Sequence, residues 1–555
     1  MTQLTGAQLI VRLLERQGVR TIAGLPGGAI LPFYDALSAS TQIRHVLARH
    51  EQGAGFMAQG MARVSGVPQV CIASSGPGAT NLVTAIADAC LDSIPMVIIT
   101  GQVPQSMIGT DAFQEVDIYG ITVPITKHNF LVRSAAELLD VVPDAFRIAM
   151  SGRPGPVLID VPKDVQNQLV EVGEFPPPAV ADMAPQLDMA AIESAARMIN
   201  EAARPVLYLG GGVVHSGAAP LAVQLAEQGG LPATMTLMAL GAMPMDHPLS
   251  VGMLGMHGAR YTNFVLEEAD LLICVGARFD DRAIGRAAQF CPNAKIVHID
   301  VDRSELHKIK NAHVAIHADV TEALEALLPR VKVTLRQDWL ARVADLKQRF
   351  PMQFPAIDDP RSHYGLVKAV ADALDDEAVI ATDVGQHQMW VAQAYPFRRP
   401  RQWLTSGGLG TMGFGLPTAM GAALAEPERT VVCFSGDGSF KMNIQELATL
   451  AEEGLNVKIV LMNNNALGLV YQQQALFYGK RQFASRYRTE PDFVKIAEGF
   501  GVPALDLDLA DDPRAALAKA LNEPGPCLIH ATIDREQFVY PMVPPGAANT
   551  EMIGG

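Results

Sequence analysis

Short, unbroken runs of Val, Ile and Leu that end at glycine or proline restrict the fold of this chain more than any other feature. Such runs are typical of parallel strands buried on both faces of a sheet. They alternate with longer segments of helical periodicity over nearly the whole chain, in three successive sets. Because parallel strands need crossover connections, usually helices, the pattern predicts an α/β fold with three consecutive doubly wound parallel-sheet domains.

Three domains also agree with the length of the chain. A chain of 555 residues exceeds one hydrophobic core, and roughly 150–200 residues per domain suggests about three. A proline-rich, strand-poor stretch at residues 174–186 follows the first set, and a charged stretch at residues 349–365 precedes the third. We therefore predict domains at residues 1–170, 188–335 and 362–545. The first and third sets are similar in size and pattern, which fits an old duplication.

Charge and hydropathy exclude several classes of partner. The net charge of −15 and the absence of a basic stripe argue against nucleic acid and anionic lipid. The longest apolar runs, such as "PMVIIT", are far shorter than the ~20 residues that span a bilayer. The N-terminus lacks the basic start and cleavage site of a signal peptide, so we expect a cytoplasmic protein. Six scattered cysteines without a Cys-x-x-Cys pair are expected to be buried, reduced thiols.

The most specific chemical pattern lies in "VVCFSGDGSFKMNIQELATLAEEGLNVKIVLMNNNALG". An apolar strand ends at Asp437, a helix follows, and a second apolar strand ends at Asn464. Ligands of doubly wound sheets bind beyond the carboxyl ends of the strands, so both side chains are expected to face one crevice. Their oxygens suit Mg²⁺ that keeps other positions for phosphate. A lone Gly-Asp-Gly is usually only a turn, but the second strand end favours a magnesium and diphosphate site.

Glu51 is the second unusual residue. It begins "EQGAGFMAQGMAR", a stretch otherwise built mainly of glycine, alanine, methionine and phenylalanine. An isolated glutamate here could simply favour a helix N-terminus. Apolar surroundings would raise the pKa of such an acid toward proton sharing.

Gly-Asp-Gly followed by a double Asn makes the chain similar to the thiamine-diphosphate enzymes. The resemblance implies that Glu51 contacts the pyrimidine ring of the cofactor and activates it. It also implies that Asp437, Asn464 and the backbone carbonyl of Ala466 hold Mg²⁺.

Within that family the chain most resembles the catalytic large subunits of the acetolactate synthases. "GLPGGAILPFYDAL", "RHEQGAGFMAQGMAR", "SSGPGATN", "GQVPQSMIGTDAFQE", "GMLGMHG", "GARFDDR", "DVGQHQMW", "LTSGGLGTMGFGLP" and "YPMVPPGAANTEMIGG" match in order. The resemblance implies a transferase that decarboxylates pyruvate and joins the two-carbon unit to a second 2-ketoacid. Pyruvate as acceptor gives 2-acetolactate, and 2-ketobutyrate gives 2-aceto-2-hydroxybutyrate, in branched-chain amino acid biosynthesis.

The resemblance assigns roles to further residues. Gln114 and Lys163 join Glu51 as catalytic residues. Cofactor-binding positions besides those already named are Gly28, Ala29, Gln386, His387, Gly410, Met412, Gly438 and Ser439. Met412 would hold thiamine in its bent shape, and Phe113 would line the substrate site.

The acceptor ketoacid is an anion, and a guanidinium suits a carboxylate. Arg282 is the expected partner, with Met256 packed nearby, although alone these residues would more often form a surface ion pair and a core contact. Many synthases carry a tryptophan at the position of Gln473, where it favours 2-ketobutyrate. The glutamine makes this chain more similar to the bacterial isozyme I form, and we expect little preference for 2-ketobutyrate.

The middle domain resembles an FAD-binding domain, with "GGGVV" for close backbone approach and "HIDVD" for a ribose hydroxyl. The glycines alone also suit a purely structural domain. The resemblance further implies a homodimer or homotetramer with shared active sites and a small regulatory subunit.

Three other functions stay open at this point. Pyruvate oxidase shares the fold, thiamine, FAD and the glutamate, but passes electrons to the flavin. Glyoxylate carboligase has an apolar residue where this chain has Glu51. A non-catalytic scaffold on the same fold is the third alternative, because fold does not determine function.

Overall fold

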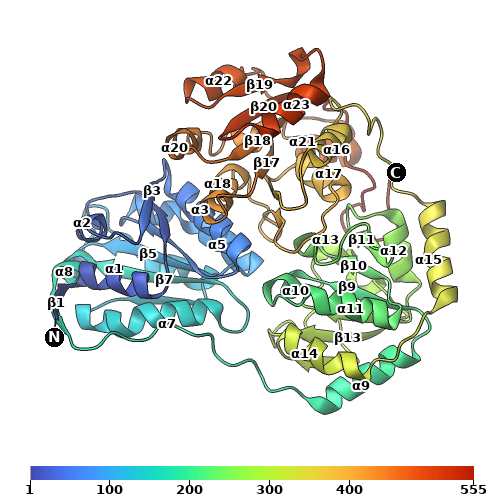
Figure 1. Cartoon of the computed structure of the whole chain (residues 1–555), viewed down its shortest axis with the longest axis horizontal. Helices are drawn as coiled ribbons and strands as arrows, with labels where there is room; N and C mark the ends of the chain where they lie inside the picture. Colours follow the sequence, from blue (N-terminus) through green and yellow to red (C-terminus); the bar gives the residue numbers. More distant parts are fainter. Residues whose placement is uncertain (1, 555) are drawn as a thin grey trace.

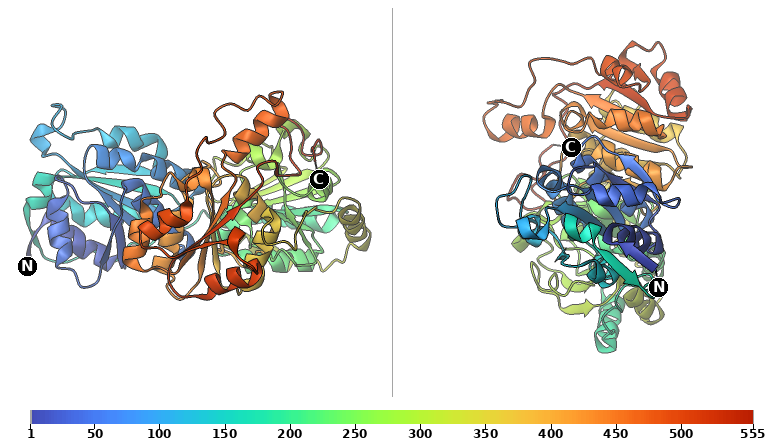
Figure 2. Two further views of the ribbon diagram at one scale, coloured as in Figure 1. Left: turned by 90° about the horizontal axis from the view of Figure 1, so that it is seen from above. Right: turned by 90° about the vertical axis from the view of Figure 1, so that its left-hand side faces the viewer.

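The computed structural model describes residues 2–554 as three α/β domains. Each domain has one six-stranded sheet in which all neighbouring strands are parallel. The third domain, orange to red, lies against both the first, in blue, and the second, in green (Figures 1 and 2). The expected fold class is therefore confirmed.

The first sheet has the strand order β3-β2-β4-β5-β7-β6, and an antiparallel ribbon of β1 and β8 lies beside it. The strands of the first domain, with the ribbon included, are β1 (Thr2–Thr5), β2 (Thr21–Gly24), β3 (Arg44–Leu47), β4 (Gln69–Ala73), β5 (Met96–Gln102), β6 (His128–Leu131), β7 (Pro156–Pro162) and β8 (Leu169–Val172). Its helices are α1 (Gly6–Arg16), α2 (Leu31–Ser38), α3 (Glu51–Ser65), α4 (Pro77–Asn81), α5 (Val83–Asp92), α6 (Ile118–Thr122), α7 (Leu138–Met150) and α8 (Lys163–Asn167).

The second sheet has the order β11-β10-β9-β12-β13-β14. Its strands are β9 (Pro205–Leu209), β10 (Ala233–Met235), β11 (Ser250–Met253), β12 (Leu271–Val275), β13 (Lys295–Asp300) and β14 (Val314–His317). Its helices are α9 (Met189–Glu201), α10 (Gly211–His215), α11 (Ala219–Gly229), α12 (Arg260–Glu267), α13 (Asp281–Ile284), α14 (Val320–Leu327) and α15 (Gln337–Arg349). Numbered within the domain the order is 3-2-1-4-5-6, which is common in dinucleotide-binding folds.

The third sheet, β16-β15-β17-β18-β20-β19, repeats the order of the first strand for strand. Its strands are β15 (Val379–Thr382), β16 (Trp403–Leu404), β17 (Val431–Gly436), β18 (Val457–Asn463), β19 (Ala504–Asp506) and β20 (Cys527–Thr532). Its helices are α16 (His363–Ala373), α17 (Gln386–Ala394), α18 (Gly415–Ala425), α19 (Asp437–Phe440), α20 (Glu446–Glu453), α21 (Gly468–Phe477), α22 (Phe493–Gly499) and α23 (Pro513–Asn522).

Helices α3 and α18 pack the first domain against the third at very short range. A Cβ atom on Gly60 would lie 2.1 Å from the carbonyl oxygen of Thr418, and one on Gly421 would lie 2.0 Å from that of Met57. Only glycine allows backbones to approach so closely. This contact explains the small residues that accompany Glu51 in the sequence.

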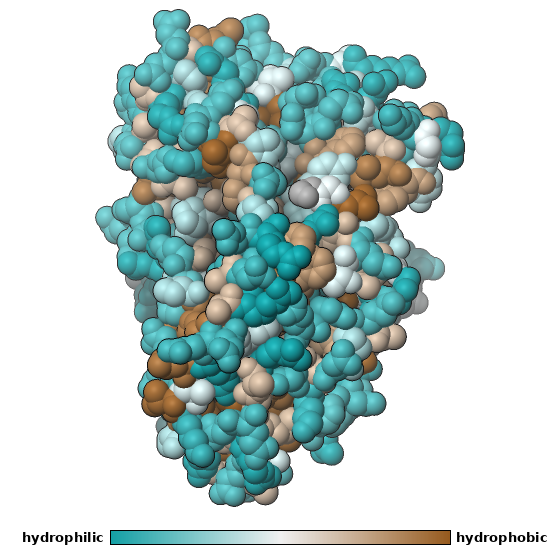
Figure 3. All heavy atoms as spheres, turned by 90° about the vertical axis from the view of Figure 1, so that its right-hand side faces the viewer, coloured by the Kyte–Doolittle hydropathy of each residue, from teal (hydrophilic) through white to brown (hydrophobic). Residues whose placement is uncertain are grey.

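The outer surface is mainly polar where the second domain is exposed. On the face that carries α12 and α15, hydrophobic side chains form small separate groups (Figure 3). Among the described residues, no helix combines the length and the hydropathy needed to cross a bilayer. All six cysteines are free, and five of them are buried, while Cys90 is half-buried.

Candidate active site

Adjacent strands of the third sheet end in loops that carry the predicted cofactor residues. Gln386 follows β15, Met412 lies in the loop after β16, Asp437 follows β17 and Asn464 follows β18. Because these four strands are neighbours and parallel, their carboxyl ends form one edge. The structure thus brings the predicted diphosphate and metal residues to one place.

Asp437 presents an oxygen that has no partner. Its side chain is buried, its Oδ1 accepts no hydrogen bond from the described residues 2–554, and its Oδ2 lies 3.3 Å from Nζ of Lys441. Burial raises the pKa of Asp437 above its ordinary value, and Lys441 partly opposes that shift. A buried, unpaired carboxylate oxygen is costly unless it binds a cation, so this atom fits a metal ligand.

The double-asparagine loop is ordered by its own side chains. Oδ1 of Asn464 accepts a hydrogen bond from the N–H of Ala466 at 3.2 Å, and Nδ2 of Asn464 donates to Oε1 of Gln386 at 3.0 Å. The backbone N–H of Asn464 also faces the Asp437 carboxylate. Asp437, Asn464 and Ala466 therefore belong to one local structure.

His387 and two glycines complete the diphosphate side of this edge. Burial lowers the pKa of His387 to about 3, so the ring is neutral, and its Nε2 has no hydrogen-bond partner in the part of the chain that the structure describes. A Cβ on Gly436 would lie 2.8 Å from Nδ1 of His387, and a Cβ on Gly438 would lie 3.0 Å from the Tyr487 hydroxyl. Ser439, which is also buried, donates to the carbonyl of Gly436 at 3.2 Å. The two glycines thus let the backbone lie close to His387 and Tyr487, and Nε2 of His387 is a polar atom that can contact an anionic ligand.

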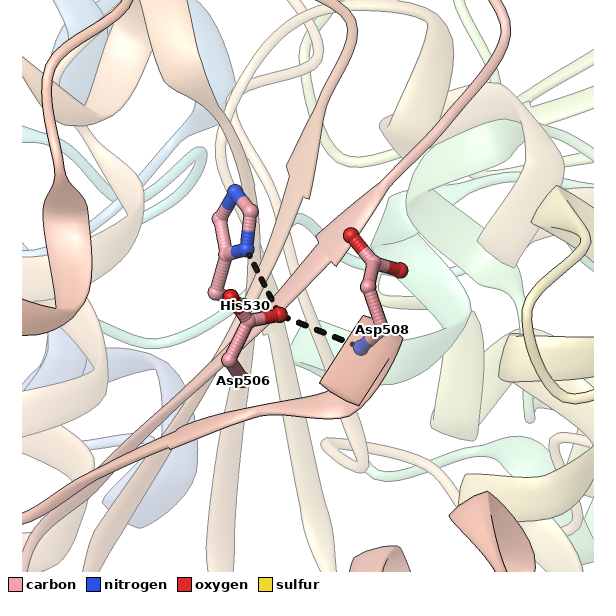
Figure 4. A group of neighbouring side chains, drawn as sticks. All are labelled: Asp506, Asp508 and His530. Carbon is pink, nitrogen blue, oxygen red and sulfur yellow. Dashed lines mark hydrogen bonds and ion pairs between the residues drawn. The ribbon is translucent and has the colours of Figure 1, made fainter. Parts of the chain in front are cut away.

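A second group of potential metal ligands lies at the same end of the third sheet. Asp506, Asp508 and His530 place ligand atoms within 4.8 Å of one another (Figure 4). Asp506 accepts the backbone N–H of Asp508 at 3.1 Å and faces Nδ1 of His530 at 3.4 Å. Asp508 accepts the backbone N–H of Thr532 at 3.1 Å. Because these groups largely satisfy one another, Asp437, whose Oδ1 has no partner among residues 2–554, is the better candidate for a metal ligand.

Glu51 begins α3 and has only 8% of its surface exposed. Its Oε2 accepts a hydrogen bond from Nδ2 of Asn81 at 2.9 Å. A Cβ on Gly78 would lie 3.2 Å from Oε1. Asn81 and Gly78 both belong to "SSGPGATN", but no role in holding the glutamate was predicted for them.

The other predicted residues of the first domain lie in loops at the carboxyl ends of its strands. Ala29, beside Gly28, donates its N–H to Oγ of Ser74 at 3.3 Å. Gln114 has a φ of 59°, and its neighbour Phe113 is 87% exposed. Lys163, which begins α8 directly after β7, lines a separate hollow with Leu31 and Asp35.

Within residues 2–554 of one chain, the first-domain and third-domain parts of the predicted site are not joined to one another. Among residues 2–554, no hydrogen bond or ion pair links Glu51 to Gln114, Lys163 or Asp437. Glu51 also does not line the large cavity that contains Gly410. The first and third domains thus present two separate halves of the predicted site.

A cavity of about 470 Å³ between the domains joins the predicted substrate residues. Met256, Arg282, Gly410 and Gln473 all line it. Nη1 of Arg282 lies 3.8 Å from Sδ of Met256, and among the described carboxylates the guanidinium makes only a long contact of 3.9 Å, with Asp281. Arg282 is therefore available to an anionic ligand in this cavity.

The same cavity extends along the carboxyl edge of the second sheet. Gly210 follows β9, Gly276 follows β12, and Asp300 ends β13. A Cβ on Gly210 would lie 2.1 Å from the carbonyl oxygen of Gly276. Burial raises the pKa of Asp300 to about 6. Since the strand order reverses between β9 and β12, this is the place where such sheets bind dinucleotides.

A buried charge network that the sequence reading missed holds the loop around Gly410. Arg63 donates to Asp92 at 2.8 Å, and Asp92 accepts the N–H of Gly408 at 2.7 Å. Asp88 accepts the hydroxyl of Thr411 at 2.7 Å. The sequence does contain a signal for this network, because Asp88 and Asp92 lie one turn apart within the apolar helix α5. Acids in such a position are rarely buried without a partner.

Comparisons with known proteins agree with this arrangement. The profiles of the "Thiamine pyrophosphate enzyme" N-terminal TPP binding domain, central domain and C-terminal TPP binding domain match residues 4–121, 192–327 and 383–531. The chain is 65% identical to the acetolactate synthase isozyme 1 large subunit of Escherichia coli K12, with 100% of this chain and 98% of the relative covered. It is 48% identical to the isozyme 2 large subunit of the same organism, with 99% of each covered. Identity is 47% to the chloroplastic acetolactate synthase 2 of Nicotiana tabacum, with 99% and 85% covered.

Proposed function

The chain belongs to the acetolactate synthase large subunits of the thiamine pyrophosphate enzymes, and we propose that it converts two 2-ketoacids into an acetohydroxyacid. It is an enzyme of the transferase class. Pyruvate is the donor, a second pyruvate is the main acceptor, and 2-acetolactate is the main product.

The cavity that joins Arg282, Met256 and Gln473 to Gly410 carries this proposal. The loop of Gly410 belongs to the thiamine diphosphate-binding domain. A guanidinium with no close carboxylate partner in the same cavity can bind the carboxylate of an acceptor ketoacid. The polar Gln473 offers no apolar surface to the extra methyl group of 2-ketobutyrate, which fits a preference for pyruvate.

Mg²⁺ would be held by Asp437, Asn464 and the backbone carbonyl of Ala466. The unpaired Oδ1 of Asp437 is the observation that fits a cation here. Gln386 and the neutral His387 would bind the diphosphate. When bound, thiamine diphosphate supplies the carbon nucleophile of the reaction, and Mg²⁺ anchors its diphosphate.

Glu51 would exchange a proton with the pyrimidine ring of the cofactor. The half-buried amide of Asn81 holds one of its oxygens, and the second oxygen faces Gly78, where no side chain intervenes. A carboxyl group fixed in this way keeps one oxygen available for a ligand. Gln114 and Lys163 would complete the catalytic group from the same edge of the first sheet.

FAD is the ligand that best fits the second domain. Gly210 and Gly276 permit close approach of the backbone to a pyrophosphate, and Asp300 can accept a ribose hydroxyl. The 3-2-1-4-5-6 strand order supports the same class of ligand. These three residues line the same cavity as Arg282, so a bound flavin would line the acceptor site.

A second copy of the chain would complete each active site. Glu51 and the metal loop do not meet within one chain, and apolar residues near both halves are exposed, with Phe113 at 87% and Met442 at 51%. A homodimer, or a homotetramer built from it, would bring the first domain of one chain to the third domain of the other. The large-subunit names of the relatives suggest a small regulatory subunit as a further partner.

The test is pyruvate turnover by purified protein with thiamine diphosphate, Mg²⁺ and FAD, followed by product identification. We expect 2-acetolactate, with no bleaching of the flavin. Acetate or acetyl phosphate with flavin reduction would instead make the protein a pyruvate oxidase. No turnover, even with a candidate small subunit present, would leave a scaffold as the function.

A further inference from the structure

A buried carboxylate of the third domain contacts the start of the helix that carries Glu51. Glu446 begins α20 and its side chain has no exposed surface. Its Oε1 accepts the backbone N–H groups of Arg49 and His50, each at 3.0 Å. Its Oε2 accepts the hydroxyl of Thr449 at 2.8 Å. The two backbone donors immediately precede Glu51.

These contacts supply what the start of α3 needs. The first N–H groups of a helix have no partner within the helix, and negative charge is favourable there. His50 caps the helix locally, because its Nδ1 accepts the N–H of Gln52 at 3.1 Å. Glu446 adds an acceptor from another domain for the two residues that lead into the helix.

The chain leaves space for this acceptor at Gly53. A Cβ at that position would lie 2.5 Å from Oε1 and 2.8 Å from Cδ of Glu446. Any side chain at position 53 would therefore displace the carboxylate. A second link joins the same region, because Nδ2 of Asn443 contacts Oε1 of Gln52 at 3.3 Å and the carbonyl of Gly413 at 2.6 Å.

We propose that Glu446 is a positioning residue, which orients the Glu51 carboxyl by fixing the backbone of Arg49 and His50. This inference rests on the proposed function, because the orientation of Glu51 matters for catalysis only if that residue activates thiamine diphosphate. The carboxylate oxygens of Glu446 are occupied by Arg49, His50 and Thr449. Its substitution should lower cofactor activation more than cofactor binding.

The first measurement is backbone amide hydrogen exchange of the segment 48–53 in the full-length protein. Glu446→Ala removes the acceptor of both N–H groups, so we expect exchange there to become at least about tenfold faster. Glu446→Gln keeps a carbonyl oxygen that can accept both, so most of the protection should remain.

The second measurement is deuterium exchange at C2 of bound thiamine diphosphate, with the cofactor's Kd determined in parallel. We expect Glu446→Ala to slow C2 exchange by about 10- to 100-fold, as small misplacements of a reacting group do. The Kd should stay within about threefold, because the diphosphate and metal residues lie elsewhere. Combining the change with Glu51→Gln should add little further loss, since both act through one group.

Glu452→Gln is the matched control on the same helix. Glu452 pairs with the Arg49 guanidinium at the surface, so this variant removes a charge near Arg49 and leaves the backbone contacts intact. Both exchange rates should match the wild type.

Gly53→Ala disturbs the contact from the other side and covers the case in which Glu446→Ala does not fold. Alanine favours a helix over glycine, yet its Cβ should displace Glu446 and slow C2 exchange. Unchanged C2 exchange in folded Glu446→Ala or in Gly53→Ala, with faster amide exchange, would overturn the positioning role. Absence of pyruvate turnover by the wild type would overturn the proposed function alone, and the amide measurement would still test the backbone contact.

Discussion

The first and third domains have the same sheet topology but offer very different side chains at the carboxyl ends of their strands. Both sheets have the order 2-1-3-4-6-5 when numbered within the domain. After the second strand, the first domain presents Glu51, whereas the third presents the loop of Met412. After the third strand, the first presents Ser74 and Ser75, whereas the third presents Asp437.

The comparison shows that the position of a binding site and the chemistry of that site have different causes. Parallel topology determines that ligands meet the carboxyl edge of either sheet. The residues at that edge then decide the ligand. A carboxyl group among small side chains suits proton exchange, whereas an unpaired aspartate beside asparagines suits a metal ion. The second domain, with its different strand order, offers glycines and Asp300 to a dinucleotide.

The largest expected effect is at the first-domain edge. Glu51→Gln should lower kcat by about 10²–10⁴-fold, the range for loss of a proton-transfer group. The Kd values for thiamine diphosphate and Mg²⁺ should change little, because the third domain is intact. Pyruvate consumption and cofactor titration measure the two effects. A large rise in either Kd with normal kcat would contradict the division of labour between the domains.

The reciprocal change is Asp437→Asn at the third-domain edge. We expect the affinity for Mg²⁺ to fall by at least about 100-fold, because loss of a ligand itself should cost no less than the upper end of the roughly 10–100-fold range seen when residues around a ligand are changed. Isothermal titration of the apo protein measures this directly. Asp506→Asn is the control, because that carboxylate already has internal partners. An equal loss of affinity in the control would indicate that the metal binds at the cluster of Asp506, Asp508 and His530.

The two domains should also respond to pH with opposite signs. Burial raises the pKa of Asp160 to about 7, while Thr100 and Gln102 bond its carboxyl group. The protonated form of Asp160 is thus favoured in the folded protein. Its contribution to the free energy of unfolding is fully present below pH about 4 and is lost as the pH rises through about 7. Burial lowers the pKa of His387 to about 3. The contribution of the neutral His387 to the free energy of unfolding is therefore fully present above pH about 6.5 and is lost as the pH falls toward 3.

In the wild type, Asp160 should therefore lower the free energy of unfolding by about 1.4 kcal/mol for each pH unit between pH 4 and 7. Asp160→Asn should abolish this pH dependence. His387→Asn should remove the opposite slope at lower pH. Denaturant unfolding of the apo protein at several pH values checks both. Parallel curves for wild type and Asp160→Asn would show that the Asp160 pKa is not raised by folding.

The smallest expected effect concerns the acceptor. Gln473→Trp adds apolar surface to the cavity and should shift the preference toward 2-ketobutyrate by about 1 kcal/mol, or roughly fivefold. The ratio of the two products at equal concentrations of both acceptors measures it. Gln474→Trp, one residue along the same helix, is a suitable comparison, because it does not line the cavity. An unchanged ratio in Gln473→Trp would remove this residue from the acceptor site.

Much of the fold could be predicted because its signal is local. Strands such as β5 and β7 are buried on both faces, so their hydrophobic runs identify them and their helical connections imply a parallel sheet. Short strands such as β10, β16 and β19 carry no such signal. They have only two or three residues, too few for a hydrophobic pattern to develop.

For the site, the sequence by itself determined which residues end the strands. Asp437 and Asn464 could be placed at one edge because parallel topology brings successive strand ends together. Only the tertiary structure decided which groups support them. The contacts of Glu446 with Arg49 and His50, and of Asp92 with Gly408, join segments hundreds of residues apart. Such pairs depend on how domains pack, and no periodicity along the chain records that packing.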